Sequence, residues 1–118
     1  MSENMQELVG CHLTDFKMEN EILTFHTDKG EIVYQTVGDC CSYTWWESID
    51  NEDALRDATV LSAEDCEMPN AVDDHPEEHD QVQFYGVKIH TTKGDATIDF
   101  RNDSNGYYGG WYKLVPQR

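Results

Sequence analysis

Two histidines and a glutamate near the middle of the chain match a catalytic motif. His75, Glu78 and His79 fit the H-x-x-E-H pattern of some zinc proteases. That pattern works on a helix, where the two histidines lie one turn apart and share a metal. Pro76 and its acidic, aperiodic surroundings favour a loop instead. We therefore expect no metal and no cofactor, and keep open a small metal-binding or metal-dependent protein that uses His75, His79 and nearby carboxylates.

The cysteines also argue against catalysis. None of them forms a C-x-x-C pair, and the adjacent Cys40 and Cys41 are poor disulfide partners. Asp39 lies beside them and disfavours the reactive thiolate form. Buried, inert thiols are the expected state, and no phosphate-binding loop or nucleophile motif appears elsewhere. Without such motifs, we expect a protein that is not an enzyme. The acidic N-terminus does not resemble a secretory signal, so we expect it in the cytoplasm.

Acidic residues are concentrated in the middle of the sequence. The net charge is −16, and fourteen of the 24 acidic residues fall between 39 and 80, where Arg56 is the only base. Like charges at this density oppose a compact state and repel phosphates, which excludes direct nucleic-acid binding. We define the acidic patch by the eleven carboxylates expected to meet a partner: Asp50, Glu52, Asp53, Asp57, Glu64, Asp65, Glu67, Asp73, Asp74, Glu77 and Glu78.

The charge favours a binding protein that docks on a basic surface of a host protein. Its density approaches that of duplex DNA, which predicts, as one form of this function, a nucleic-acid mimic that inhibits a defence or DNA-handling enzyme. A solvated surface that merely keeps the chain soluble is the plainer alternative. A third is a structural or assembly protein, including a homodimer, with an aromatic interface built from Tyr107, Tyr108, Trp111 and Tyr112; between the two roles, we expect these rings to belong to the core. No apolar run is long enough to span a membrane.

Alternating apolar residues and turn signals predict a mainly β (α+β) fold. We expect an antiparallel, hairpin-rich sheet or half-barrel of about six to seven strands, in a single domain over 1–118. A short helical face is expected from Trp45, Trp46 and Ile49, followed by a second helical turn with Asp50 or Asn51 as its N-cap. The acidic stretch 39–80 is interpreted as an insertion with an exposed loop at 68–80. The expected strands cover 7–17, 21–27, 31–37, 59–67, 81–92, 95–101 and a last segment that ends near 114.

One short segment occurs twice. His26-Thr27-Asp28-Lys29-Gly30-Glu31 is echoed 64 residues later by His90-Thr91-Thr92-Lys93-Gly94-Asp95. An old duplication would explain the echo, and so would two hairpins that arrived separately at the same turn chemistry. With so short a match, we expect the second explanation.

Two longer motifs carry a resemblance to a known family. Asp39-Cys40-Cys41-Ser42 followed by Glu47-Ser48-Ile49, together with Asp103-Ser104-Asn105-Gly106-Tyr107-Tyr108, resembles a family of small acidic proteins from bacteriophages and bacteria that is catalogued as a domain of unknown function. The resemblance covers about Leu8 to Leu114. It implies a phage origin and suggests no catalytic residues. By analogy with other phage-encoded acidic domains, it implies that the chain binds a host protein.

Overall fold

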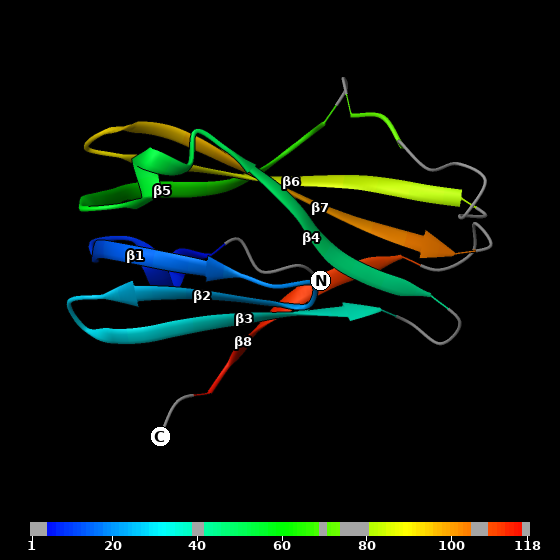
Figure 1. Ribbon diagram of the computed structural model, residues 1–118, viewed down its shortest axis with the longest axis horizontal. Coiled ribbons are helices and arrows are strands. Elements are labelled where there is room, and N and C mark those ends of the chain that lie inside the picture. The colour runs from blue at the N-terminus through cyan, green and yellow to red at the C-terminus, as the bar shows by residue number, and fades with distance from the viewer. Residues whose placement is uncertain (1–4, 39–41, 69–70, 74–80, 105–108, 117–118) are drawn as a thin grey trace.

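Eight antiparallel strands form one open sheet in the computed structural model (Figure 1). The structure describes residues 5–38, 42–68, 71–73, 81–104 and 109–116. The prediction of a mainly β fold is confirmed, with eight strands in place of six to seven and two 3-10 turns as the helical part of the described chain. The elements are η1 (Gln6–Leu8), β1 (His12–Met18), β2 (Ile22–Thr27), β3 (Gly30–Gly38), β4 (Tyr43–Asp50), η2 (Glu52–Leu55), β5 (Ala58–Cys66), β6 (Gln81–Thr91), β7 (Gly94–Ser104) and β8 (Gly110–Val115).

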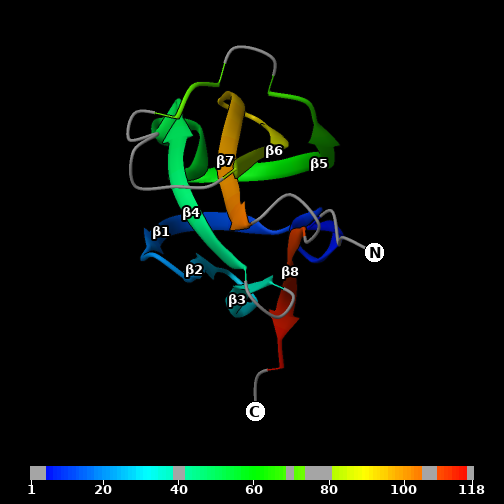
Figure 2. The ribbon, with the colours of Figure 1, turned by 90° about the vertical axis from the view of Figure 1, so that its right-hand side faces the viewer.

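The sheet curls so that one edge strand returns toward the opposite half. The strand order is β4-β7-β6-β5-β1-β2-β3-β8, which makes β4 and β8 the edges. The backbone N–H of Trp46 in β4 nevertheless donates to the carbonyl of Asn20, 2.8 Å away in the β1–β2 turn. The Thr44 hydroxyl donates to the carbonyl of Val37 in β3 at 3.0 Å. β4 therefore crosses from one half of the molecule to the other (Figure 2).

Aromatic rings fill the centre of the curl. Tyr112 of β8 is fully buried and touches three rings, those of Tyr34, Trp46 and Phe100, at centroid distances of 5.7, 5.5 and 5.3 Å. Burying such rings contributes more apolar area than any aliphatic side chain supplies. Part of the aromatic segment near the C-terminus is thus core, while Tyr107 and Tyr108 lie outside the described residues.

The helical face expected from Trp45, Trp46 and Ile49 is wrong, because residues 43–50 form strand β4. Trp46 and Ile49 are both buried although they are three positions apart, a spacing that normally indicates a helix. A β-bulge accounts for it: Trp46 pairs with Phe100 and Ser48 with Asp99, which leaves Glu47 as an extra residue. The bulge returns Ile49 to the core face.

The segments that precede β1 and β5 differ from their predictions. Residues 6–8 form η1 in place of a strand, and Gly10, at φ 87°, turns the chain before β1. Asn51 precedes η2 as predicted, yet it has a left-handed φ of 62° and its side chain does not cap the turn. Its Nδ2 instead donates to the carbonyl of Asp95 at 2.8 Å, which ties η2 to the β6–β7 hairpin.

The repeated segments form the same hairpin turn twice. In the β2–β3 turn, the Thr27 hydroxyl donates to the Gly30 carbonyl at 2.6 Å and accepts from the Lys29 N–H at 3.0 Å. In the β6–β7 turn, the Thr91 hydroxyl makes the matching bonds to Gly94 and Lys93 at 3.0 and 3.1 Å. The same six-residue chemistry therefore produces the same geometry.

The likeness extends far beyond the turns. Leu13 pairs with Thr27 and the register then slips past Thr14, just as Val60 pairs with Thr91 and the register slips past Leu61. The strands β1–β3 of one half and β5–β7 of the other thus have the same order, the same hairpin turn and a bulge at the equivalent position. The fourth strands are exchanged: β4 follows β3 but pairs with β7, and β8 follows β7 but pairs with β3. This agreement favours a duplication, contrary to our expectation from the short echo alone.

Equivalent glycines in the two turns should respond alike to substitution. Gly30 and Gly94 have φ values of 105° and 122°, where a Cβ strains the backbone whatever the surrounding space. We expect Gly30→Ala and Gly94→Ala each to lower the free energy of unfolding by about 1–3 kcal/mol, measured by urea denaturation. Lys29→Ala, in the same turn at negative φ, is the control and should change stability by less than about 0.5 kcal/mol. A large effect at one glycine alone would contradict the equivalence.

Candidate acidic docking surface

Most described members of the acidic patch lie on the surface. Seven of them are exposed and Asp73 is half-buried, while Asp74, Glu77 and Glu78 lie outside the described residues, as do His75 and His79. Among the described residues, no group of three or more histidine, cysteine or acidic side chains could hold a metal ion. The exposed members are Asp50, Glu52, Asp53, Asp57, Glu64, Asp65 and Glu67.

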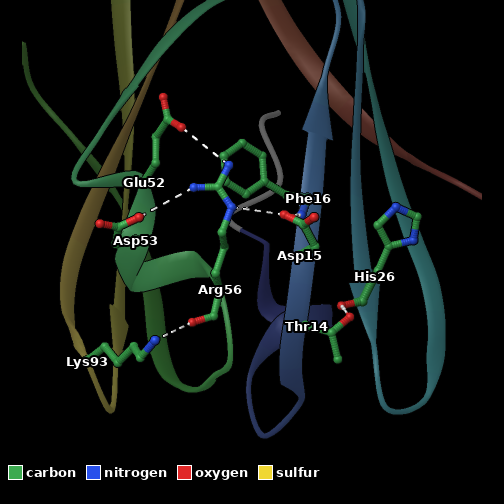
Figure 3. Close-up of polar contacts among 8 residues, drawn as sticks. All are labelled: Thr14, Asp15, Phe16, His26, Glu52, Asp53, Arg56 and Lys93. Atoms are coloured by element: carbon green, nitrogen blue, oxygen red, sulfur yellow. Dashed lines mark hydrogen bonds and ion pairs between the residues drawn. The ribbon is translucent and has the colours of Figure 1, made fainter.

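Arg56 gathers three carboxylates at one end of the patch (Figure 3). Its Nε donates to Asp15 at 3.0 Å, and its two terminal nitrogens lie 3.5 Å from Glu52 and Asp53. The guanidinium also lies over the ring of Phe16, with Cζ 4.7 Å from the centroid. A hydrogen bond from the Phe16 backbone N–H, followed by the one from Arg56, lowers the pKa of Asp15. Arg56 therefore partly neutralises the charges of Glu52 and Asp53.

Two further members of the patch contact histidines. The Nε2 atom of His12 lies 2.9 Å from Asp57, and that of His90 lies 2.8 Å from Glu64. The other ring nitrogen of His90 lies 2.7 Å from Asp95, its cross-strand neighbour. Hydrogen bonds to Glu64 first and Asp95 second raise the pKa of His90, because both carboxylates favour its charged form. The charge of the patch at this point therefore depends on pH.

The His90 contacts should stabilise the protein at low pH. A raised pKa in the folded state gives stabilisation that is complete below the ordinary histidine pKa and lost as pH rises through the folded value. We expect a nuclear magnetic resonance titration of the His90 ring to give a pKa above 6.5. Glu64→Gln and Asp95→Asn should each lower it, whereas Asp50→Asn should leave it unchanged. A His90 pKa at or below the ordinary value would refute the contacts.

A buried ion pair holds part of the segment after β5. Asp99 and Arg101 are six and eight per cent exposed, and the carboxylate accepts from Nε and a terminal nitrogen of the guanidinium at 3.1 and 2.9 Å. Another nitrogen of Arg101 donates to the carbonyl of Val72 at 3.0 Å, and the guanidinium lies over Phe84. The sequence predictions, which concentrated on 39–80, missed this pair. Its signal was two opposite charges at positions that share one face of the strand expected over 95–101.

A cavity of about 430 Å³ lies next to the acidic patch, where β5 ends beside β6 and the start of β8. Four of its lining residues are aromatic, and Asp65 and Glu67 of the patch lie among the others. Gly86 leaves room for this arrangement, since a Cβ there would lie 2.6 Å from the sulfur of Met68. Burial raises the pKa of the Cys66 thiol, which disfavours the reactive form. The lining residues are Asp65, Cys66, Glu67, Met68, Phe84, Tyr85, Gly86, Phe100, Gly110 and Trp111.

The fold and the surface together define a small, mainly β protein with exposed carboxylates beside an aromatic cavity. The chain belongs to the family described as domain of unknown function (DUF7448), which matches residues 6–114. This confirms the expected membership of a family of unknown function. Neither a curated protein nor a solved structure matches the chain. Within the described residues, no helix has the length and apolar character needed to cross a membrane.

Proposed function

We propose that the chain is a non-enzymatic binding protein that docks on a basic surface of a host protein in the cytoplasm. The observation that carries the proposal is the exposure of the acidic patch, with seven carboxylates on the surface among the described residues. A basic partner relieves the repulsion among them, so that part of the electrostatic cost of the fold is recovered on binding. Because the resemblance implies a phage origin, the partner would be a protein of the infected bacterium.

Internal pairing divides the patch into two parts with different availability. Glu52, Asp53, Asp57 and Glu64 contact cationic or titratable side chains of the chain itself. Asp50 and Glu67 have no ion pair among the described residues, and Glu67 lies beside Asp65 at the cavity. We propose that the surface around Glu67, beside the cavity, makes the closest contact with the partner.

The specific form of the proposal is mimicry of nucleic acid. A cleft that evolved to bind phosphates presents basic side chains at a spacing that a row of carboxylates is able to meet. The partner would then be an enzyme that handles or cleaves nucleic acid, and duplex DNA would compete with this chain for it. A partner that binds this chain without competition from DNA would leave docking intact and exclude mimicry.

Binding should depend steeply on salt and on the charge of the patch. The Debye length falls roughly threefold between about 50 mM and about 500 mM salt, so we expect partners captured from a bacterial lysate at the lower value to be released at the higher. Asp65→Lys/Glu67→Lys should abolish capture. Glu19→Lys/Glu31→Lys changes the net charge equally outside 39–80 and should retain most of it. Capture that is equally strong at both salt concentrations would contradict the proposal.

A further inference from the structure

We propose that the cavity between β5, β6 and β8 receives an arginine side chain of the partner. This inference rests on the proposed function and names the group that the acidic surface recognises. The residues that line the cavity include four aromatic residues, Phe84, Tyr85, Phe100 and Trp111, and the acidic residues Asp65 and Glu67, and none of the described lining residues is basic. Aromatic faces attract a cation electrostatically, and carboxylates pair with its charge.

The chain already uses this combination for its own arginines. The Arg56 guanidinium lies over the Phe16 ring and binds the carboxylate of Asp15. Arg101 lies over Phe84, with Cζ 4.9 Å from the ring centroid, and binds Asp99. In both places a ring supports the flat face of the guanidinium while a carboxylate meets its N–H groups. Phe84, whose ring already carries Arg101, also lines the cavity, where aromatic residues and carboxylates meet again and none of the described lining residues is an arginine.

The volume of the cavity suits a single side chain better than a large free metabolite. At about 430 Å³ it accommodates a guanidinium together with its aliphatic stem, which would lie against Met68 and the aromatic rings. A planar guanidinium both stacks on rings and pairs in a forked manner with carboxylates, which a lysine ammonium does not. Arginine is also one of the residues that most often dominate binding when inserted in a pocket at an interface.

The duplicated plan of the fold places a second, smaller hollow at the corresponding position of the other half. There β4 passes the β1–β2 turn, and Asn20, Tyr43, Trp45 and Asp103 enclose about 250 Å³. The Tyr43 and Trp45 rings are stacked with centroids 5.5 Å apart. Trp45 and Trp111 occupy equivalent positions in the exchanged strands, opposite Arg101 and Val37. Rings and carboxylates thus meet twice in the fold, and the larger hollow lies in the acidic patch.

The test measures binding of defined peptides to the full chain. The probe is a short acetylated peptide of alternating glycine and arginine, compared with matched peptides in which neutral citrulline or lysine replaces arginine. Calorimetry gives the affinities, and nuclear magnetic resonance follows the amides of Gly86 and Gly110, which line the cavity. We expect the arginine peptide to bind most tightly, the lysine peptide about tenfold more weakly and the citrulline peptide not at all.

Three variants locate the site. Trp111→Leu removes a ring, and Asp65→Asn/Glu67→Gln removes the two carboxylates without a cost in packing, because both are exposed. Each should raise the dissociation constant of the arginine peptide about tenfold or more. Asp50→Asn/Asp53→Asn removes the same charge elsewhere on the patch and should change it less than about threefold. Circular dichroism verifies that every variant is folded.

The outcomes separate this inference from the proposed function. Equal affinity for arginine and lysine peptides, or equal weakening by the cavity variants and by Asp50→Asn/Asp53→Asn, would overturn the arginine pocket. Salt-sensitive capture of a host protein would then still support docking by the patch. Loss of lysate capture in Asp65→Asn/Glu67→Gln together with tight binding of the arginine peptide to the unmodified chain would support both. If the cationic peptides fail to bind and capture is insensitive to salt, both proposals fall.

Discussion

Trp46→Ala is expected to lower the free energy of unfolding by about 3–5 kcal/mol, as is typical when a large buried aromatic side chain is removed. Trp46 is three per cent exposed and packs against Phe100 and Tyr112, with ring centroids 5.4 and 5.5 Å away. Its indole N–H also donates to the carbonyl of Glu21 at 3.2 Å. The substitution therefore opens a cavity and removes a contact between β4 and the β1–β2 turn.

Trp45→Ala is the matched control for this prediction. Trp45 is the neighbouring residue of the same type, but it lies on the other face of β4, half-exposed and stacked on Tyr43. We expect its replacement to lower the free energy of unfolding by about 1 kcal/mol, measured by urea denaturation with circular dichroism. Similar losses for the two variants would show that β4 does not present these two residues on opposite faces.

Removing one partner of the Asp99–Arg101 pair should lower the free energy of unfolding about as much as Trp46→Ala does. Asp99→Ala removes the carboxylate that binds Arg101 through two nitrogens, and leaves the guanidinium buried without that partner. We expect the free energy of unfolding to fall by about 3–5 kcal/mol. Thermal and urea denaturation at constant salt provide the measurement, since a buried pair is screened only weakly by ions.

The double variant Asp99→Leu/Arg101→Met decides whether the loss comes from breaking the ion pair. Apolar side chains of similar volume remove both charges together, so most of the lost stability should return. The single variants Asp99→Leu and Arg101→Met complete the comparison. If the loss of stability in the double variant equals the sum of their losses, the pair is not coupled, and the loss would then reflect packing of the Val72 segment, whose carbonyl accepts a hydrogen bond from Arg101.

Local chemistry predicted the hairpins well. Gly30 and Gly94 at positive φ, each preceded by a threonine and a lysine in equivalent positions, placed both turns correctly. Alternating residues such as Leu23 and Phe25 of β2 predicted the buried face of the first hairpin. These features depend on residues close in sequence, so the sequence alone was sufficient.

Features that depend on distant partners were missed or misinterpreted. The bulge at Glu47 gave β4 the apolar spacing of a helix, because a bulge moves every later side chain to the opposite face. Residues from the end of β5, from β6 and from the start of β8 line the aromatic cavity, and no local pattern in the sequence indicates that these segments lie close together. The exposed carboxylates of the patch were predicted, but the pairs of Asp57 with His12 and of Glu64 with His90 join distant segments and required the register of the sheet.

The exchange of β4 and β8 has a consequence for synthesis and assembly of the chain. β4 has its sheet partner in β7, so during translation it has no sheet partner until residues near 104 have been made. Neither half can complete its set of four strands without a strand from the other. Two copies that met in this period would be able to satisfy the same pairings by exchanging β4.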